Sequence, residues 1–174
     1  MVKLKFKKLD ERAVIPSYAH VGDIGLDVTA IDLEYDNEHD VYIYHTGLAC
    51  EMERGYALLC MARSSNTKTE SYLPNGVGLV DPATYRGEIQ FRYKNRDKIN
   101  IPSFHIPGNL WGTDEEDKYE EEYRKNFILS RAPHKVGDRI GQFVIVQVPE
   151  VEIEETDTLS ETERGTGGFG STGK

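Results

Sequence analysis

The sequence predicts an all-β fold, a sandwich or jelly roll, with one helical segment inserted into it. Apolar residues recur at every second position in several short runs, which is the periodicity of half-buried strands. The chain also contains 16 glycines and 7 prolines, and several of them stand between these runs and mark turns. With 174 residues, 38% of them hydrophobic, the chain is long enough for one domain with a substantial core. Short strands separated by frequent turns are typical of sandwiches and jelly rolls.

The first half of the chain predicts an edge strand followed by more central ones. Apolar residues alternate with lysines over residues 2–7, and outward lysines are typical of an edge. The pattern breaks at the glycines of residues 22–25 and resumes over residues 26–30. Residues 41–52 and 55–64 predict two more strands around a glycine-containing turn.

The later strand signals are a hairpin and two longer runs. Residues 72–81 read YLPNGVGLVD, which predicts a hairpin with its turn at residues 74–76. Residues 87–95 alternate apolar and polar side chains. Residues 139–155 are the strongest strand signal because they are rich in Val and Ile.

The strand pattern stops between about 95 and 133, which we interpret as an insertion on the β scaffold. Residues 113–127, TDEEDKYEEEYRKNF, predict a short helix. Thr113 can be its N-cap and Glu116 the reciprocal partner in a capping box. Acidic residues fill the first turn, where the helix dipole favours them, and Glu120 lies four residues before Arg124.

Charge and composition limit the classes of partner. The net charge of −9 argues against nucleic-acid or anionic-membrane binding, although a local basic cluster could still hold a small polyanion. No apolar run approaches the roughly 20 residues of a membrane span, and the N-terminus lacks a signal-peptide pattern, so we expect a cytoplasmic protein. Cys50 and Cys60 are expected to be reduced core thiols, because a disulfide-stapled domain would normally contain more cysteines. Their spacing, without a nearby pair of histidines, does not suit zinc.

One carboxylate stands where a general base would be useful. Asp81 follows an apolar strand and precedes Pro82, which would hold it at a strand end where it can orient a water molecule. The alternative is that Asp-Pro simply starts a turn. The Tyr85 ring could pack on a sugar face or be an ordinary core tyrosine, and Arg86 is interpreted as a structural ion-pair partner.

Polar residues at other strand ends could hold phosphate or metal. Arg63, Ser64 and Ser65 end a strand, where hydroxyls and amides can cradle phosphate oxygens, or where they could be a plain helix N-cap. Asp27 could face a hydrated Mg²⁺ or satisfy turn amides. Gln142 lies inside an apolar run and needs hydrogen-bond partners from a ligand, a neighbouring subunit or the backbone.

The chain ends in RGTGGFGSTGK, residues 164–174. Arg164 offers a bidentate fork for phosphate, Ser171 and Thr172 offer hydroxyls and amides, and the glycines allow a close wrap around a ligand. Phe169 is the one large apolar side chain in this stretch. The alternative is a flexible polar end, as in many termini.

The order of these segments resembles the trimeric, all-β dUTPases. Five short motifs define that family, and all five occur here in sequence, over nearly the whole chain except the insertion. They lie at residues 19–30, 62–69, 75–88, 135–146 and 164–173.

The resemblance implies a jelly-roll or β-clip dUTPase-like barrel and hydrolysis of dUTP to dUMP and pyrophosphate, which lowers dUTP and supplies dUMP for thymidylate synthesis. It implies that Asp81 activates the water, that Tyr85 packs against the deoxyribose, and that Asp27 stands near Mg²⁺ through water or supports the site structurally. The implied substrate-binding residues are Arg63, Ser64, Ser65, Asn75, Gly78, Tyr85, Gln142, Arg164, Phe169, Gly170, Ser171 and Thr172.

The resemblance further implies a homotrimer in which three subunits share each active site. Residues 1–163 would form the β domain, and residues 164–174 a mobile arm that closes over the site. Phe169 would stack on the uracil as this arm closes.

Two departures from the family pattern stand out. The step from Asp81 to Tyr85 is one residue longer than usual, which bears on the sugar contact, and Gly141 replaces the usual Ala. The insertion at 95–133 is longer than in compact members and is similar to that of some bacteriophage members. A phage-encoded protein would act in the host cell cytoplasm.

Two rival functions stay open at this point. A dCTP deaminase-type enzyme on the same fold would need a base near C4 of cytosine, and Glu88 is the near candidate. Alternatively, the chain is a phage regulatory protein that binds a protein partner through the insertion. Trp111 would then be an interface anchor rather than a cap on a sheet edge.

Overall fold

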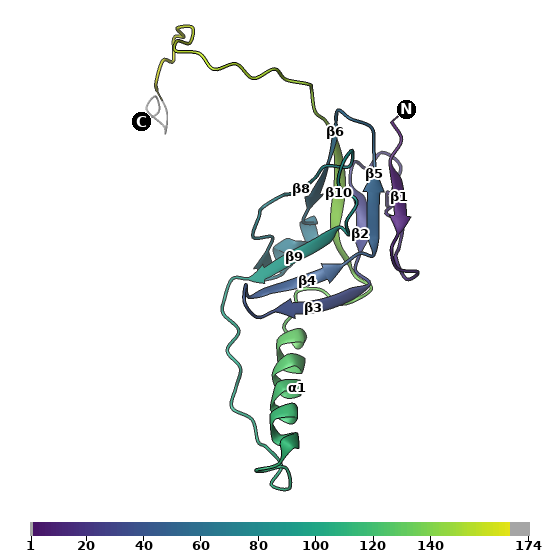
Figure 1. Ribbon diagram of the computed structural model, residues 1–174, viewed down its shortest axis with the longest axis vertical. Coiled ribbons are helices and arrows are strands. Elements are labelled where there is room, and N and C mark those ends of the chain that lie inside the picture. The colour runs from purple at the N-terminus through teal and green to yellow at the C-terminus, as the bar shows by residue number, and fades with distance from the viewer. Residues whose placement is uncertain (1, 168–174) are drawn as a thin grey trace.

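A computed structural model describes residues 2–167 of the chain as ten strands, one 3₁₀ turn and one α-helix (Figure 1). The strands are β1 (Lys5–Lys8), β2 (Leu26–Thr29), β3 (Asp32–Asp36), β4 (Val41–His45), β5 (Leu48–Glu51), β6 (Tyr56–Met61), β7 (Ser71–Tyr72), β8 (Gly78–Val80), β9 (Gln90–Asn95) and β10 (Arg139–Gln147). The 3₁₀ turn η1 covers Ser64–Lys68, and the helix α1 covers Asp114–Ser130.

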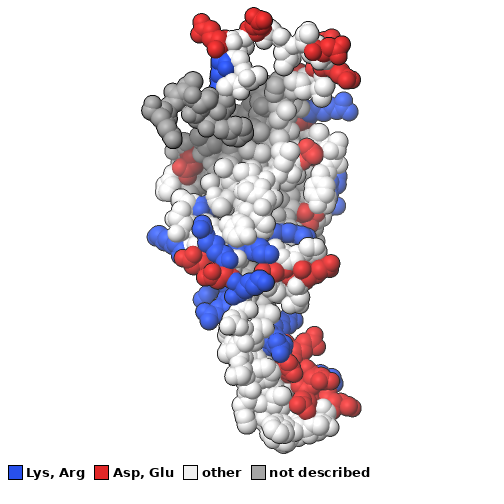
Figure 2. Space-filling model, turned by 90° about the vertical axis from the view of Figure 1, so that its left-hand side faces the viewer, with Lys and Arg blue, Asp and Glu red and all other residues white. Residues whose placement is uncertain are grey.

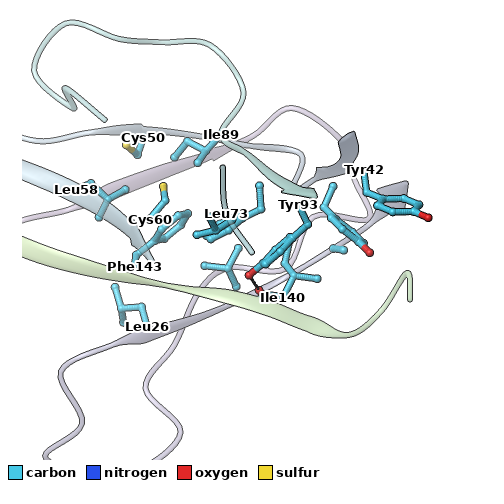
Figure 3. Packing of buried hydrophobic residues seen from close by; sticks show 14 of the residues in the cluster. Leu26, Tyr42, Cys50, Leu58, Cys60, Leu73, Ile89, Tyr93, Ile140 and Phe143 are labelled. Carbon is cyan, nitrogen blue, oxygen red and sulfur yellow. Dashed lines mark hydrogen bonds between the residues drawn. The ribbon is translucent and has the colours of Figure 1, made fainter. Parts of the chain in front are cut away.

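Two four-stranded sheets and one two-stranded pair make up the β scaffold. Their strand orders are β2-β10-β6-β8, β3-β4-β9-β7 and β1-β5, and every pairing is antiparallel. Side chains from the two larger sheets meet in one core, where Phe91 stacks on Phe143 with ring centroids 5.9 Å apart. Figure 3 shows Phe143 among other buried side chains of this core. The all-β prediction is confirmed, and β1, paired only with β5 among the described strands, lies at an edge as its lysines predicted.

Three buried tyrosines tie the core to distant backbone. Tyr93 donates a hydrogen bond to the Ile140 carbonyl at 2.6 Å, Tyr44 to the His134 carbonyl at 2.9 Å and Tyr42 to the Ile128 carbonyl at 2.8 Å. Burial raises the pKa of the Tyr42 hydroxyl to about 12, so it remains a donor at neutral pH. These bonds satisfy polar atoms that would otherwise be costly to bury, and the last of them fixes the C-terminal end of the insertion helix.

The prediction of two strands over residues 41–64 is wrong, because the structure has three. Gly47 separates β4 from β5 with a φ of +64°, a conformation that favours glycine. A Cβ there would also lie 2.5 Å from the Ile31 side chain. This corner moves the chain from the sheet of β4 to the pair with β1.

The predicted hairpin over residues 72–81 has the right turn but the wrong pairing. The Gly76 amide donates to the Leu73 carbonyl at 2.9 Å, which closes the turn. However, β7 pairs with β9 and β8 pairs with β6, so the turn connects the two large sheets instead of joining two paired strands.

Two other strand boundaries differ from expectation. The run over residues 139–155 is a strand only as far as Gln147. Beyond Pro149, Val151 and Ile153 are 71% and 92% exposed, so apolar alternation alone does not make a strand without a neighbour to pair with. The short strand β3 is additional to the predicted set, and its three acidic residues explain its weak signal.

The insertion projects from the body as a long loop followed by one helix, α1 (Figure 1). The Thr113 hydroxyl accepts from the Glu115 amide at 3.3 Å, so the predicted N-cap is present. The predicted reciprocal bond of the capping box, from the Thr113 amide to Glu116, is wrong. Glu116 instead accepts a hydrogen bond from the amide of Gly112, one residue earlier. The ion pair of Glu120 with Arg124 is confirmed at 2.7 Å. Figure 2 shows the acidic side chains along one side of this helix.

Trp111 lies inside the insertion and is two-thirds exposed. Its indole N–H donates to the Ile106 carbonyl at 2.9 Å. The ring therefore does not cap a sheet edge, and that alternative is wrong. Phe104 stacks on Tyr123 with centroids 4.2 Å apart, which holds the approaching loop along α1.

Gly141 provides a test of core packing. A Cβ at this position would lie 2.7 Å from Cδ1 of Phe91 and would overlap the ring edge. We expect Gly141→Ala to lower the free energy of unfolding by about 1–3 kcal/mol, since Phe91 must leave its stack on Phe143. Urea unfolding measures the change. Gly108→Ala is the matched control because nothing lies within 4 Å of its Cβ position. Adding Phe91→Leu to Gly141→Ala should recover part of the loss, and an unchanged urea midpoint for Gly141→Ala would contradict the packing argument.

Candidate active site

A cavity of about 510 Å³ lies beside β9 and under the turn that joins β7 to β8. Asn75, Gly78, Asp81 and Tyr85 all line it. The structure thus brings together the residues of this segment that the sequence analysis assigned to uracil binding, to the sugar contact and to water activation. Concave sites with a few convergent polar groups are the usual form of a small-molecule pocket.

The loop after β8 keeps Asp81 and Tyr85 at the same cavity despite the additional residue between them. The Thr84 and Tyr85 amides both donate to the Asp81 carbonyl, at 3.0 and 2.8 Å. The backbone therefore forms a tight turn after Asp81, and this turn accommodates the additional residue between Asp81 and Tyr85. Asp81 itself is exposed at the end of β8, where water can reach its carboxylate.

Arg86 stabilises this loop through contacts with its backbone and with Glu51, as the structural interpretation of that residue predicts. Its guanidinium donates to the Pro82 carbonyl at 2.9 Å and to the Ala83 carbonyl at 3.1 Å. It also lies 3.6 Å from the Glu51 carboxylate. Arg86 is thus engaged with the loop backbone rather than pointing a free charge into the cavity.

The floor of the cavity is formed where β8 lies close against β6. A Cβ on Gly78 would lie 3.0 Å from Cβ of Cys60, its partner in the sheet. The absence of a side chain leaves the Gly78 backbone open to the cavity. Burial raises the pKa of the Cys60 thiol to about 12, and Cys50 and Cys60 are both free and buried, as predicted.

A second polar cluster is centred on Asp27. Arg63 donates to its Oδ1 and Arg139 to its Oδ2, each at 2.8 Å. Sequence reasoning assigned no role to Arg139, and its pairing with a residue 112 positions away leaves no local signal. Each Asp27 oxygen therefore already accepts a hydrogen bond from an arginine. Within residues 2–167 no group of three or more His, Cys, Asp or Glu side chains can hold a metal, so the described residues do not form a protein cage for Mg²⁺.

The other predicted phosphate residues lie near this cluster. Gln142 is paired in the sheet with Asp27 on one side and Met61 on the other, and its amide donates to the Ala62 carbonyl at 3.3 Å. Of the three kinds of partner left open for the Gln142 side chain, the described chain thus provides the backbone. Ser64 and Ser65 begin η1 and are exposed, and the N-cap is Arg63 without a side-chain bond, so the N-cap interpretation of the serines is wrong.

The two groups do not line the same cavity within one chain. The residues lining the cavity at Asp81 do not include Arg63, Ser64, Ser65 or Gln142. Arg164 is exposed and donates to the Gly167 carbonyl at 2.8 Å. The predicted residues Phe169, Gly170, Ser171 and Thr172 lie outside the described residues.

The fold and this pocket define an all-β protein with a site for a polar small molecule. Comparison with known proteins makes this specific. The dUTPase family model matches residues 126–173. The deoxyuridine 5'-triphosphate nucleotidohydrolase of Trichodesmium erythraeum is 35% identical over 173 residues, which are 99% of each chain. The chain belongs to the dUTPase family.

Solved structures of related phage proteins share the fold. A dUTPase of Staphylococcus bacteriophage 80alpha with dUpNHpp matches with a TM-score of 0.69 and 22% identity over 99% of both chains. A dUTPase from phage phi11 of S. aureus, whose structure concerns a structural Mg(II) ion, matches with a TM-score of 0.62 and 22% identity, covering 91% of this chain and 99% of that one. Among the described residues no helix is long and apolar enough to span a bilayer.

Proposed function

We propose that this protein hydrolyses dUTP to dUMP and pyrophosphate. The observation that carries the proposal is the single cavity that holds Asn75, Gly78, Asp81 and Tyr85 in a chain of the dUTPase family. Hydrolysis would lower dUTP and supply dUMP for thymidylate synthesis.

In the proposed mechanism Asp81 orients a water molecule and accepts its proton as the water oxygen attacks the α-phosphorus. The bond from that phosphorus to the bridging oxygen breaks, and pyrophosphate leaves in line. The position of Asp81 at the exposed end of a strand that pairs with β6 supports this role, because the carboxylate is accessible to water while the preceding backbone is held in the sheet.

Uracil recognition is proposed for the turn and strand around Gly78. Uracil presents an N–H donor between two carbonyl acceptors, whereas cytosine presents an acceptor and a donor in two of those places. A backbone edge arranged for uracil would place like groups against cytosine, which is strongly unfavourable. Asn75 lies beside this edge in the cavity, and Tyr85 would pack on the deoxyribose and leave no room for a 2′-hydroxyl.

The phosphate chain is proposed to be held by the second cluster of a neighbouring subunit. Arg63, Ser64, Ser65 and Gln142 do not line the Asp81 cavity of their own chain, which supports a homotrimer with shared sites. The division into a body of residues 1–163 and a closing arm of 164–174, with Arg164, Phe169, Gly170, Ser171 and Thr172 as ligands, belongs to the same proposal.

Mg²⁺ is proposed as the cofactor, brought to the site by the triphosphate. Asp27 is already engaged by two arginines, so it does not fit a direct ligand. Its contact through water stays a prediction, and no step above depends on it. Cytoplasmic location, in the host cell for a phage gene, also stays a prediction from the sequence.

The test of the proposed function is pyrophosphate release from dUTP, dTTP, dCTP and UTP, with Mg²⁺ and with chelator. We expect turnover of dUTP alone and its loss with chelator. Ammonia release from dCTP would favour the deaminase alternative. The structure argues against that alternative, because both oxygens of Glu88 already accept hydrogen bonds or lie in an ion pair.

A second function, binding of a regulatory protein partner through the insertion, is supported by the exposed Trp111 and the projecting helix. Replacing residues 103–124 with a short glycine linker would test it while keeping Ile128, whose side chain is buried in the core. Hydrolysis should persist in this variant, and partner binding should be lost.

A further inference from the structure

Glu88 is a half-buried carboxylate with partners at the β4–β5 corner and at the start of β9. Its Oε1 accepts from the Gly47 amide at 2.7 Å, and its Oε2 lies 2.8 Å from Nδ1 of His45 and 3.2 Å from the Gln90 side-chain amide. The side chains of His45 and Glu88 are only 25% and 24% exposed. Glu88 also lines the 510 Å³ cavity that contains Asp81, yet the mechanism above assigns it no role.

The Tyr85 side chain is hydrogen-bonded to the backbone of Glu88. Tyr85 donates to the Glu88 carbonyl at 3.0 Å. Its ring lies across Gly87, where a Cβ would be 2.6 Å from Cζ of the tyrosine. Because the ring rests on residues 87 and 88, its orientation depends on where that backbone is held.

The same stretch of backbone is anchored to the corner between β4 and β5. The Ile89 amide donates to the Leu48 carbonyl at 2.8 Å, and the Thr46 hydroxyl donates to the Ile89 carbonyl at 2.6 Å. The Glu88 side chain adds the bonds to Gly47 and His45 just before this anchor. Glu88 is therefore a side-chain attachment between the β4–β5 corner and the backbone on which the Tyr85 ring rests.

Opposite charges reinforce the attachment when His45 is protonated. Burial alone would raise the pKa of Glu88, but the bonds from His45, Gly47 and Gln90 lower it below its usual value. Burial alone would lower the pKa of His45, but Glu88 and Glu34 raise it. Glu34 on β3 lies 3.4 Å from Nε2 of His45, and the adjoining cavity also holds the charged side chains Asp10, Arg12 and Asp32.

We propose that Glu88, held by His45 and the Gly47 amide, is a positioning residue that fixes the Tyr85 ring beside Asp81 and so sets the preference for deoxyribose over ribose. The proposal deepens the proposed dUTP hydrolysis and rests on it. Glu88 does not touch the reacting atoms. It acts through Tyr85, whose ring would occupy the space that a 2′-hydroxyl needs.

The test compares kcat and KM for dUTP and UTP in the parent, Glu88→Ala and Glu88→Gln. We expect Glu88→Ala to raise KM for dUTP and to reduce the dUTP-to-UTP ratio of kcat/KM, each by about tenfold, since a slightly displaced positioning group costs at least that much. Glu88→Gln keeps an oxygen for the Gly47 amide and should recover most of both effects. Glu34→Ala is the control, because it removes the other carboxylate of His45 without touching residues 85–89.

Two results would overturn the inference. One is a Glu88→Ala protein whose KM and dUTP-to-UTP ratio are within twofold of the parent. The other is a folded Glu88→Ala protein whose kcat for dUTP falls while its dUTP-to-UTP ratio of kcat/KM is unchanged. If Glu88→Ala does not fold, His45→Ala decides, because it removes the side chain that holds Oε2 of Glu88 and should lower the dUTP-to-UTP ratio of kcat/KM, whereas an unchanged ratio would contradict the inference. Failure of the proposed function is distinct, because it appears as a parent protein that releases no pyrophosphate from dUTP.

Discussion

Asp81→Asn is expected to lower kcat for dUTP by about 10²–10⁴, the usual contribution of a positioned general base. Asparagine has nearly the same shape and can still contact a water molecule, but it cannot accept the proton. Since Asp81 is exposed and its carbonyl, not its side chain, closes the loop to Tyr85, the substitution should leave the pocket and KM for dUTP nearly unchanged.

Steady-state pyrophosphate release across a range of dUTP concentrations measures this effect. Asp157→Asn is the matched control, because it removes the same charge from the exposed segment after β10. A nucleotide-induced shift in thermal unfolding should be the same in the parent and in Asp81→Asn, which separates binding from chemistry. An Asp81→Asn protein as fast as the parent would remove Asp81 from the mechanism.

The sequence predicts this part of the site because its residues are local. Asn75, Gly78, Asp81 and Tyr85 lie within one turn-strand-turn segment, the motif at residues 75–88, and the resemblance to the dUTPases implied their common role in substrate binding. Their placement also needs little from distant contacts, since the loop closes through the Asp81 carbonyl and Arg86.

Long-range pairs had no such signal. Arg139 binds Asp27 across 112 positions, and His45 binds Glu88 across 43. Neither residue type is distinctive at its position, and only the sheet pairing brings each to its partner. Side-chain bonds between distant strands therefore had to come from the structure.

The strands show the same contrast between local features, which the sequence predicts, and long-range pairings, which it does not. Alternation correctly places Phe91 and Tyr93 toward the core, because the side-chain period of a strand reports which face is buried. The period does not report which strand is the neighbour. For this reason the turn at Gly76 was predictable, whereas its role in connecting two different sheets was not.

Removal of residues 164–174 is expected to lower kcat/KM for dUTP by about 10²–10³, the cost of losing one preorganised contact to developing charge, or by more. No residue of the core cluster lies beyond β10, and the Val148 amide, which donates to the Gly55 carbonyl at 2.8 Å, is the last described backbone contact to the body. Thermal unfolding should thus be unchanged. In Figure 1 the segment after β10 runs away from the sheets.

Pyrophosphate release and thermal unfolding of the truncated protein test this expectation. Arg164→Ala should lose affinity for dUTP and much less for dUMP, which lacks the terminal phosphates, because a guanidinium acts on those groups. Phe169→Ala should weaken both nucleotides alike if that ring covers the uracil. Full activity in the truncated protein would show that the arm has no part in turnover.

Mixing the two inactive proteins tests whether the site is shared. After co-refolding, Asp81→Asn subunits still carry the arm, and truncated subunits still carry Asp81. In a mixed trimer some pockets would combine Asp81 of one subunit with the arm of another, so activity should return well above that of either protein alone. If each chain instead completes its own site, no pocket contains both parts and the mixture stays inactive. Recovery therefore requires that the base and the arm come from different chains, which fits the separation of the two polar clusters in one subunit.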